Sequence, residues 1–321
     1  MRITPIIRKE VADHLSSRRF PLLIALVLLS GLATSYLGVQ SIVKGPIKET
    51  EQTIAFLRLL TGSEETQIPS YVYFIGLFGP IVGIALSFDS VNREVSSGSM
   101  LKLLSNPIYR DSIILGKIIA GILIILLIVF SSTGIVTGFN ILLAGFGPTI
   151  EGTFRIIYFA IASFLYIALW FSIGLLFSIV FRRTTTSALA SLAVWVFFSI
   201  FIYLVADIIA TEVAGLRYYF PEPPTSAKWL YYVTYDAVIR FSPQTLYSEV
   251  AGYILSPEIL VIYFNPYGGF YLPSLKLRPL SLDESLSLVW PSFSTLIASF
   301  VIILTLSILI FLKMEVRPSW A

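Results

Sequence analysis

The sequence predicts an all-α integral membrane protein with six transmembrane helices, an N-terminal amphipathic interfacial helix and short interfacial helices in the outer segment. Of its 321 residues, 56% are hydrophobic, and the mean hydropathy is +0.85. A soluble domain rarely exceeds about half apolar residues. Six apolar segments each approach the roughly 20 residues that a helix needs to cross the hydrocarbon core. We therefore expect residues 1–321 to form one transmembrane domain, with spans near 20–40, 71–88, 112–144, 154–181, 187–210 and 291–312.

Residues 1–19 precede the first span and carry a helical pattern of their own. Thr4-Pro5 suits an N-cap followed by a proline in the first turn. A set of apolar residues then recurs every four positions, namely Ile3, Ile7, Val11 and Leu15. The pattern predicts an amphipathic helix in the membrane interface. The first apolar run lacks a clear small-x-small cleavage site, which favours a retained anchor over a signal peptide.

The basic residues predict the direction of the spans. The segments 1–19, 89–117, 182–186 and 313–321 hold 13 Lys and Arg in 62 residues, whereas 41–70, 144–155 and 211–289 hold 9 in 121. The positive-inside rule assigns the first set, with both termini, to the cytoplasm. The largest outer segment, 211–289, is rich in Trp and Tyr around 229–247, which suits short helices at the outer interface.

The segment 89–117 is a long polar connector between two apolar spans. Its first part suits a helical extension that ends at Gly98, and Asn106-Pro107 suits a turn that opens the next helix. Between them lies a short apolar cluster made of Met100, Leu101, Leu103 and Leu104. Charged residues flank this cluster, so it forms a small apolar patch with a charged rim, which a partner's groove could accept. The competing interpretation is a solvated loop.

The residue inventory excludes several kinds of chemistry. The chain has no Cys, one His (His14) and no HExxH motif, so thiolate metal sites and cysteine nucleophiles are absent. Gly116-Lys117 is followed by Ile118, so there is no P-loop. We expect no catalytic, cofactor-binding or metal-binding residue. Asp89 and Asp207 fall near span ends, where they can be hydrated, rather than in a buried proton relay.

The connector resembles the signature of type-2 ABC transporter permeases. That signature consists, in order, of an acidic residue, a Glu, a Gly-Thr/Ser pair, a Leu-Leu-Ser/Thr-x-Pro segment, an Arg and a Gly-Lys pair. In this chain the matching positions include Asp89, Glu94, Gly98, Ser99, Leu103, Leu104, Pro107 and Arg110. The resemblance extends in outline over the whole chain. Residues 241–255, FSPQTLYSEVAGYIL, are similar to a segment of archaeal and copper-maturation-type members.

The resemblance implies a multi-pass permease subunit of an ABC exporter in the cell membrane. The matching connector residues would couple it to a cytoplasmic ABC ATPase subunit, which would carry the ATP and Mg. Ile3, Ile7, Val11 and Leu15 would belong to its elbow helix. A second permease chain, identical or paralogous, and membrane lipid would complete the partners, and residues 211–289 would be extracellular.

Two other functional classes stay open from the sequence. One is a secondary carrier that works without an ATPase, and the other is a membrane-embedded enzyme or assembly scaffold. An ABC ATPase that co-purifies with the chain would discriminate between these classes and the permease. No basic cluster with interleaved aromatics occurs in a soluble segment, so we expect no nucleic-acid partner. The substrate is not readable from the sequence.

Overall fold

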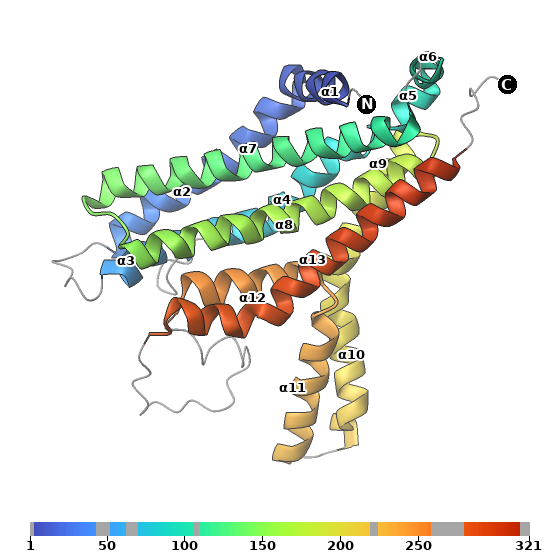
Figure 1. Cartoon of the computed structure of the whole chain (residues 1–321). Helices are drawn as coiled ribbons and strands as arrows, with labels where there is room; N and C mark the ends of the chain where they lie inside the picture. The colour runs from blue at the N-terminus through green and yellow to red at the C-terminus, as the bar shows by residue number, and fades with distance from the viewer. Residues whose placement is uncertain are drawn as a thin grey trace.

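The computed structural model describes residues 3–42, 52–61, 70–105, 109–218, 224–257 and 279–314, all of whose regular elements are helices (Figure 1). Six helical stretches are long and apolar enough to cross a membrane, which confirms the predicted all-α membrane fold. They are α2 (Arg19–Ile42), α4 (Tyr71–Ser87) with its continuation, α7 (Arg110–Ala144), α8 (Ile150–Val180), α9 with α10 (Thr184–Val196, Ile202–Ala214) and α13 (Leu282–Lys313).

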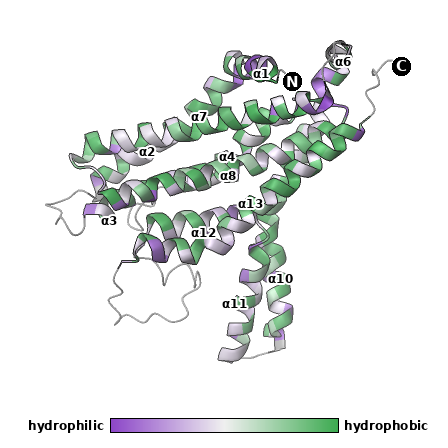
Figure 2. Cartoon of the chain, viewed as in Figure 1, coloured by the Kyte–Doolittle hydropathy of each residue, from purple (hydrophilic) through white to green (hydrophobic). Residues whose placement is uncertain are grey.

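Helix α8 is the centre of the bundle, and it packs against α4, α7, α12 (Pro243–Leu255) and α13. Its side chains Trp170 and Phe171 are fully buried. Gly83 lets α4 approach α8 very closely, because a Cβ at this position would lie 2.5 Å from the Ile167 carbonyl oxygen of α8. Figure 2 shows apolar residues along the long helices and hydrophilic ones gathered toward their ends, around α1 and α5. This distribution is the one that a lipid solvent requires.

Helix α1 (Thr4–Ser16) lies across the end of the bundle where α7 begins (Figure 1). The N-cap is Ile3 rather than the expected Thr4, and no side chain caps the helix; Pro5 still lies in its first turn. The close contact between α1 and α7 depends on Gly116, since a Cβ there would come within 2.5 Å of the Ile6 side chain. We call this end of the bundle, which also holds the connector and the end of α13, the inner end.

The connector contains the predicted sequence of short helices. Helix α5 (Asn92–Ser96) follows α4 after one turn, and α6 (Ser99–Leu104) follows α5. Gly98 separates them with a φ of 72°, a left-handed conformation that glycine adopts at little cost. Helix α7 then starts at Arg110. Residues 106–108 lie outside the described part of the chain.

The described residues of the 211–289 segment form helices, as predicted, but one of these helices packs inside the bundle and not at its surface. Helix α11 (Thr225–Ile239) runs back along α10 and leaves much of its surface exposed, including Trp229. Helix α12 instead packs inside the bundle between α8, α13 and α4. Its Tyr247 is buried and stacks on Tyr166 of α8, with ring centroids 4.6 Å apart. The aromatic residues that indicated an interfacial position therefore lie in two environments. Those of α11 include the exposed Trp229, whereas Tyr247 of α12 is buried in the core.

Arg155 joins three helices near the start of α8, at the end of the bundle opposite the inner end, which we call the outer end. The side chain is 1% exposed, and Nε and Nη2 both donate to Glu151 Oε1, at 3.0 and 2.8 Å. Nη1 donates to the Ile254 carbonyl of α12 at 2.8 Å and to Ser285 Oγ of α13 at 3.1 Å. Nη2 also donates to the Leu280 carbonyl at 2.5 Å. All five N–H donors of the guanidinium are therefore used.

We predict that Arg155→Lys lowers the free energy of unfolding by about 2 kcal/mol or more, because an ammonium cannot reproduce five donors in a fixed fork and buried carbonyls lose their partners. Denaturant unfolding in mixed micelles measures the change. The matched control is Arg217→Lys, at a residue whose side chain is 70% exposed and pairs with Glu212 at 2.9 Å. It should change stability by less than about 0.5 kcal/mol. Equal losses in the two variants would contradict a fastening role for Arg155.

Candidate functional site

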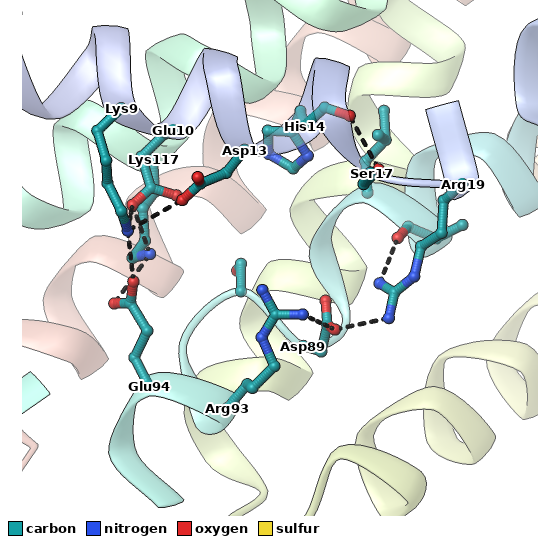
Figure 3. Close-up of a pocket in the computed structure, with 13 residues that line it drawn as sticks. Lys9, Glu10, Asp13, His14, Ser17, Arg19, Asp89, Arg93, Glu94 and Lys117 are labelled. Atoms are coloured by element: carbon teal, nitrogen blue, oxygen red, sulfur yellow. Dashed lines mark hydrogen bonds and ion pairs between the residues drawn. The ribbon is translucent and has the colours of Figure 1, made fainter. Parts of the chain in front are cut away.

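A cluster of ion pairs joins three elements at the inner end (Figure 3). We call Lys9, Glu10 and Asp13 of α1, Glu94 of α5 and Lys117 of α7 the inner ion-pair cluster. Lys117 is its centre: the side chain is 3% exposed, and Nζ lies 3.0 Å from Glu10 Oε1 and 3.0 Å from Glu94 Oε2. One buried cation from the third span therefore holds both the interfacial helix and the connector.

Lys9 closes the cluster from the solvent side. Its Nζ lies 3.0 Å from Glu10 Oε1, 3.1 Å from Glu94 Oε1 and 3.3 Å from Asp13 Oδ2. Burial alone would raise the pKa of Glu10, but Lys117 and Lys9 together hold it below its ordinary value. Burial likewise opposes the charge on Lys9, yet its hydrogen bonds and attraction to Glu10 and Glu94 raise its pKa. Lys9 and Glu10 are therefore both charged at neutral pH.

Asp89 makes a second set of ion pairs beside this cluster. It is 7% exposed at the end of α4, and its Oδ2 lies 2.9 Å from Arg19 Nη2 and 3.4 Å from Arg93 Nη1. The Arg19 guanidinium also lies over the Phe88 ring, 4.9 Å from its centroid. Asp89 thus links the start of the first span to the connector.

Hydroxyl groups from two other spans hold the connector's backbone. Ser178 Oγ of α8 accepts from the Val91 and Asn92 amides, at 2.9 and 3.3 Å. It caps the start of α5 from outside, because the N-cap residue of α5, Val91, offers no side-chain cap of its own. Ser187 Oγ of α9 donates to the Phe88 carbonyl at 2.7 Å. The connector is therefore part of the bundle, not a solvated loop over the described residues.

The remaining predicted coupling residues lie in or beside these short helices. Ser99 Oγ donates to the Glu94 carbonyl at 3.2 Å, across the turn formed by Gly98. Arg110 is exposed at the start of α7 and donates to the Met314 carbonyl, at 2.8 Å. Met100, expected in the exposed apolar cluster, is instead fully buried, whereas Leu101 is half exposed. The Leu103 and Leu104 side chains and all of Pro107 lie outside the described part of the structure.

The predicted apolar residues of α1 divide between two environments. Ile3, Ile7 and Val11 are half-buried, and Leu15 is exposed. The side facing α7 runs instead through Ile6 and the buried Glu10. One face of α1 therefore meets the bundle partly through charge, and Leu15 is free to meet a membrane surface.

A small cavity of about 110 Å³ lies beneath α1, between the inner ion-pair cluster and Asp89 (Figure 3). His14 lines it, and burial lowers the pKa of His14, so that the imidazole is neutral at pH 7. Within the described residues, no three His, Cys, Asp or Glu side chains gather in a way that could hold a metal ion. The site consists of fixed charges that join helices.

Sequence reasoning missed Glu10, Ser178 and the buried position of Lys117. Glu10 falls between the apolar positions of α1, where it reads as a solvated charge. Lys117 reads as part of a Gly-Lys pair that leads into a span. The sequence did contain a signal for Lys117. Burying a charge is costly, so a lysine that lies seven residues inside a long apolar helix needs a carboxylate partner.

Comparison with known proteins identifies one family. The family model described as "ABC-2 family transporter protein" matches residues 4–316 of this chain. Among curated proteins, no match is found. The matched range includes α1, the connector and all six apolar helices.

We predict that Lys117→Met destabilises the protein by about 3–5 kcal/mol, because it leaves two buried carboxylates with one cation fewer. Unfolding in mixed micelles measures the loss, and adding Glu10→Gln to this variant should recover part of it. Arg93→Met is the control, since this side chain is 67% exposed and reaches Asp89 only at 3.4 Å; it should cost about 1 kcal/mol or less. A Lys117→Met variant as stable as this control would show that the cluster is not a structural joint.

Proposed function

Because the chain belongs to the ABC-2 family of transporter proteins, we propose that it is the permease subunit of an ABC exporter, driven by a separate cytoplasmic ATPase. The family is a membrane component of transporters, and six apolar helices fit a multi-pass membrane protein of this kind. ATP and Mg would bind to the ATPase, which supplies the hydrolysis. The permease would contribute movement of its spans and no covalent chemistry.

The inner end would face the cytoplasm. The first basic residues, the connector, the α8–α9 turn with Arg182 and Arg183, and Lys313 at the end of α13 all belong to this end of the bundle (Figure 1). These are the segments in which Lys and Arg are densest. The positive-inside rule therefore favours cytoplasmic termini and an extracellular 211–289 segment.

The observation that carries the proposal is Lys117 between Glu10 and Glu94. The connector would be the surface that an ATPase contacts. Because Lys117 joins α5 to α1 and α7, a displacement of the connector would move the third span and the interfacial helix together. Rigid joints of this kind transmit motion without a large change in any one contact. Asp89, with Arg19, would extend the joint to the first span.

Two such chains, identical or paralogous, would pair in the membrane. The span formed by α9 and α10 and the outer surface of α13 support this, because both leave many large apolar side chains exposed. Lipid would cover the rest of the apolar surface.

The orientation is tested by labelling single cysteines, because the chain has none of its own. We expect Ser226→Cys, at the start of α11, to react with an impermeant maleimide in intact cells. Ser319→Cys should react only after the membrane is opened. The reverse pattern would place the inner end outside and rule out a cytoplasmic ATPase at the connector.

The coupling is tested by Leu103→Ala combined with Leu104→Ala. Burial of two leucines in a partner groove would contribute about 1.5–3 kcal/mol each, so this variant should lose bound ATPase. The tagged chain is purified from its native membranes, and ATP hydrolysis that co-purifies with it is measured. The control is Leu123→Ala with Leu127→Ala, two exposed side chains within the third span. If no ATP hydrolysis co-purifies with the unmodified chain, the proposed function is contradicted. If the two double variants retain equal ATP hydrolysis, the connector is not the surface that binds the ATPase.

A further inference from the structure

The fifth span is broken near its middle by a π-helical turn, η3 (Phe197–Phe201), which separates α9 from α10. A π-helical turn interrupts the regular hydrogen bonding of an α-helix and is a common place for a bend. Helix α9 packs against α8 and α4, whereas α10 packs against α11, and Figure 1 shows α10 and α11 extending away from the bundle. The break therefore divides the span into one half that follows the bundle and one half that does not.

The outer half forms a small body of its own with α11. We call α10 and α11 the arm. Ala206, Ala210 and Tyr235 form an apolar core that is separate from the core of the bundle. Tyr231 stacks on Tyr235 and donates to Asp207 at 2.6 Å. In the described residues α10 and α11 pack mainly against each other, so the arm has the internal contacts of a rigid unit.

Helix α12 is anchored in the bundle on the other side of the break. Its last turn receives the Arg155 hydrogen bond through the Ile254 carbonyl. Tyr247 stacks on Tyr166, and its hydroxyl lies 3.3 Å from Ser163 Oγ of α8. Glu249 accepts a hydrogen bond from Ser292 of α13. Contacts to α8 and α13 at several levels fix α12 relative to the bundle.

Two hydroxyl contacts connect this anchored helix to the broken span. Ser242 Oγ donates to the Phe198 carbonyl, within the π-helical turn, at 2.7 Å. The same oxygen caps α12 by accepting from the Gln244 amide at 3.2 Å, and Ser242 is 0% exposed. Thr245 Oγ1 lies 3.3 Å from the Tyr203 hydroxyl of α10.

We propose that the arm is a lever that turns about η3 and that Ser242 and Thr245 hold it in its present position against α12. The π-helical turn supplies the flexible point, and the separate core keeps the arm rigid. The two hydroxyl contacts are weak enough to break, and the ion pair of Arg240, at the end of α11, with Glu249 of α12 involves a half-exposed arginine side chain and contributes little. Helix α12 is the fixed support, and it meets the broken span around η3 and the start of α10. The lever is a property of this fold, and it does not depend on the proposed ATPase or on transport.

The experiment uses the full chain in lipid nanodiscs with pairs of spin labels on introduced cysteines, since no native cysteine interferes. Trp229→Cys on α11 and Ile157→Cys on α8 report the distance from arm to bundle; both side chains are exposed. The pair Leu204→Cys and Val233→Cys reports the distance within the arm. Helix α10 has 13 residues at about 1.5 Å per residue, so the tip lies about 20 Å from the hinge. A rotation of about 15° therefore moves it by about 5 Å.

Ser242→Ala should shift or broaden the arm-to-bundle distance by about 5 Å and leave the distance within the arm unchanged. The matched control is Ser248→Ala, because Ser248 Oγ bonds only to carbonyls of its own helix. Thr245→Val removes the second contact with little change in volume, and it provides the same test if Ser242→Ala does not fold.

The proposal would be overturned if Ser242→Ala and Thr245→Val gave the same arm-to-bundle distances as Ser248→Ala. It would also be overturned if the distance within the arm changed as much as the distance to the bundle. The distances are measured in the chain without an ATPase, so these outcomes decide the lever alone, and the proposed function is decided separately by the co-purification of ATP hydrolysis.

Discussion

The exclusion of water from the interior of the helix bundle is the constraint on which the rest of this structure depends. A polar group buried there must find its partner within the protein, because neither packed apolar side chains nor lipid offer one. Arg155 meets this constraint with five donors directed at three helices. Lys117 meets it with a carboxylate on each side. In both places the cost of a buried charge becomes the reason why separate helices stay joined.

The two ends of the bundle provide partners for their buried charges in different ways. At the inner end, charge pairs with charge between α1, the connector and α7, and hydroxyl groups of α8 and α9 bind backbone groups at and beside the connector. At the outer end, a single guanidinium binds the carbonyl of Ile254 in α12 and that of Leu280, two residues before α13. Between the two ends, α8 packs through tightly fitted apolar residues such as Trp170. Stiff joints at both ends and a close-packed centre suit a helix bundle that moves in large pieces and does not bend smoothly.

The spans could be predicted from the sequence because hydropathy measures the quantity that the membrane selects. The predicted bounds agree with the helices to within a few residues, apart from α13, which begins at Leu282. Its early start follows from a capping box formed by Ser281 and Glu284, a signal independent of hydropathy. The depth of α12 and the partners of Glu10 could not be predicted, because both are set by contacts between residues far apart in the sequence. Of the predicted connector residues, Asp89 and Glu94 lie in the ion pairs that form the joint.

The capping of α5 by Ser178 of α8 has a consequence for the order in which the protein folds during synthesis. A helix of five residues is too short to be stable alone, and its first amides are satisfied by Ser178, 87 residues later than Val91. A ribosome therefore releases the connector long before the hydroxyl that completes it has been synthesised. The connector can take its final form only once the fourth span has entered the membrane beside the second. Maturation of this surface is thus timed by insertion of α8, and a chain truncated before Ser178 would present an unfinished connector to the cell.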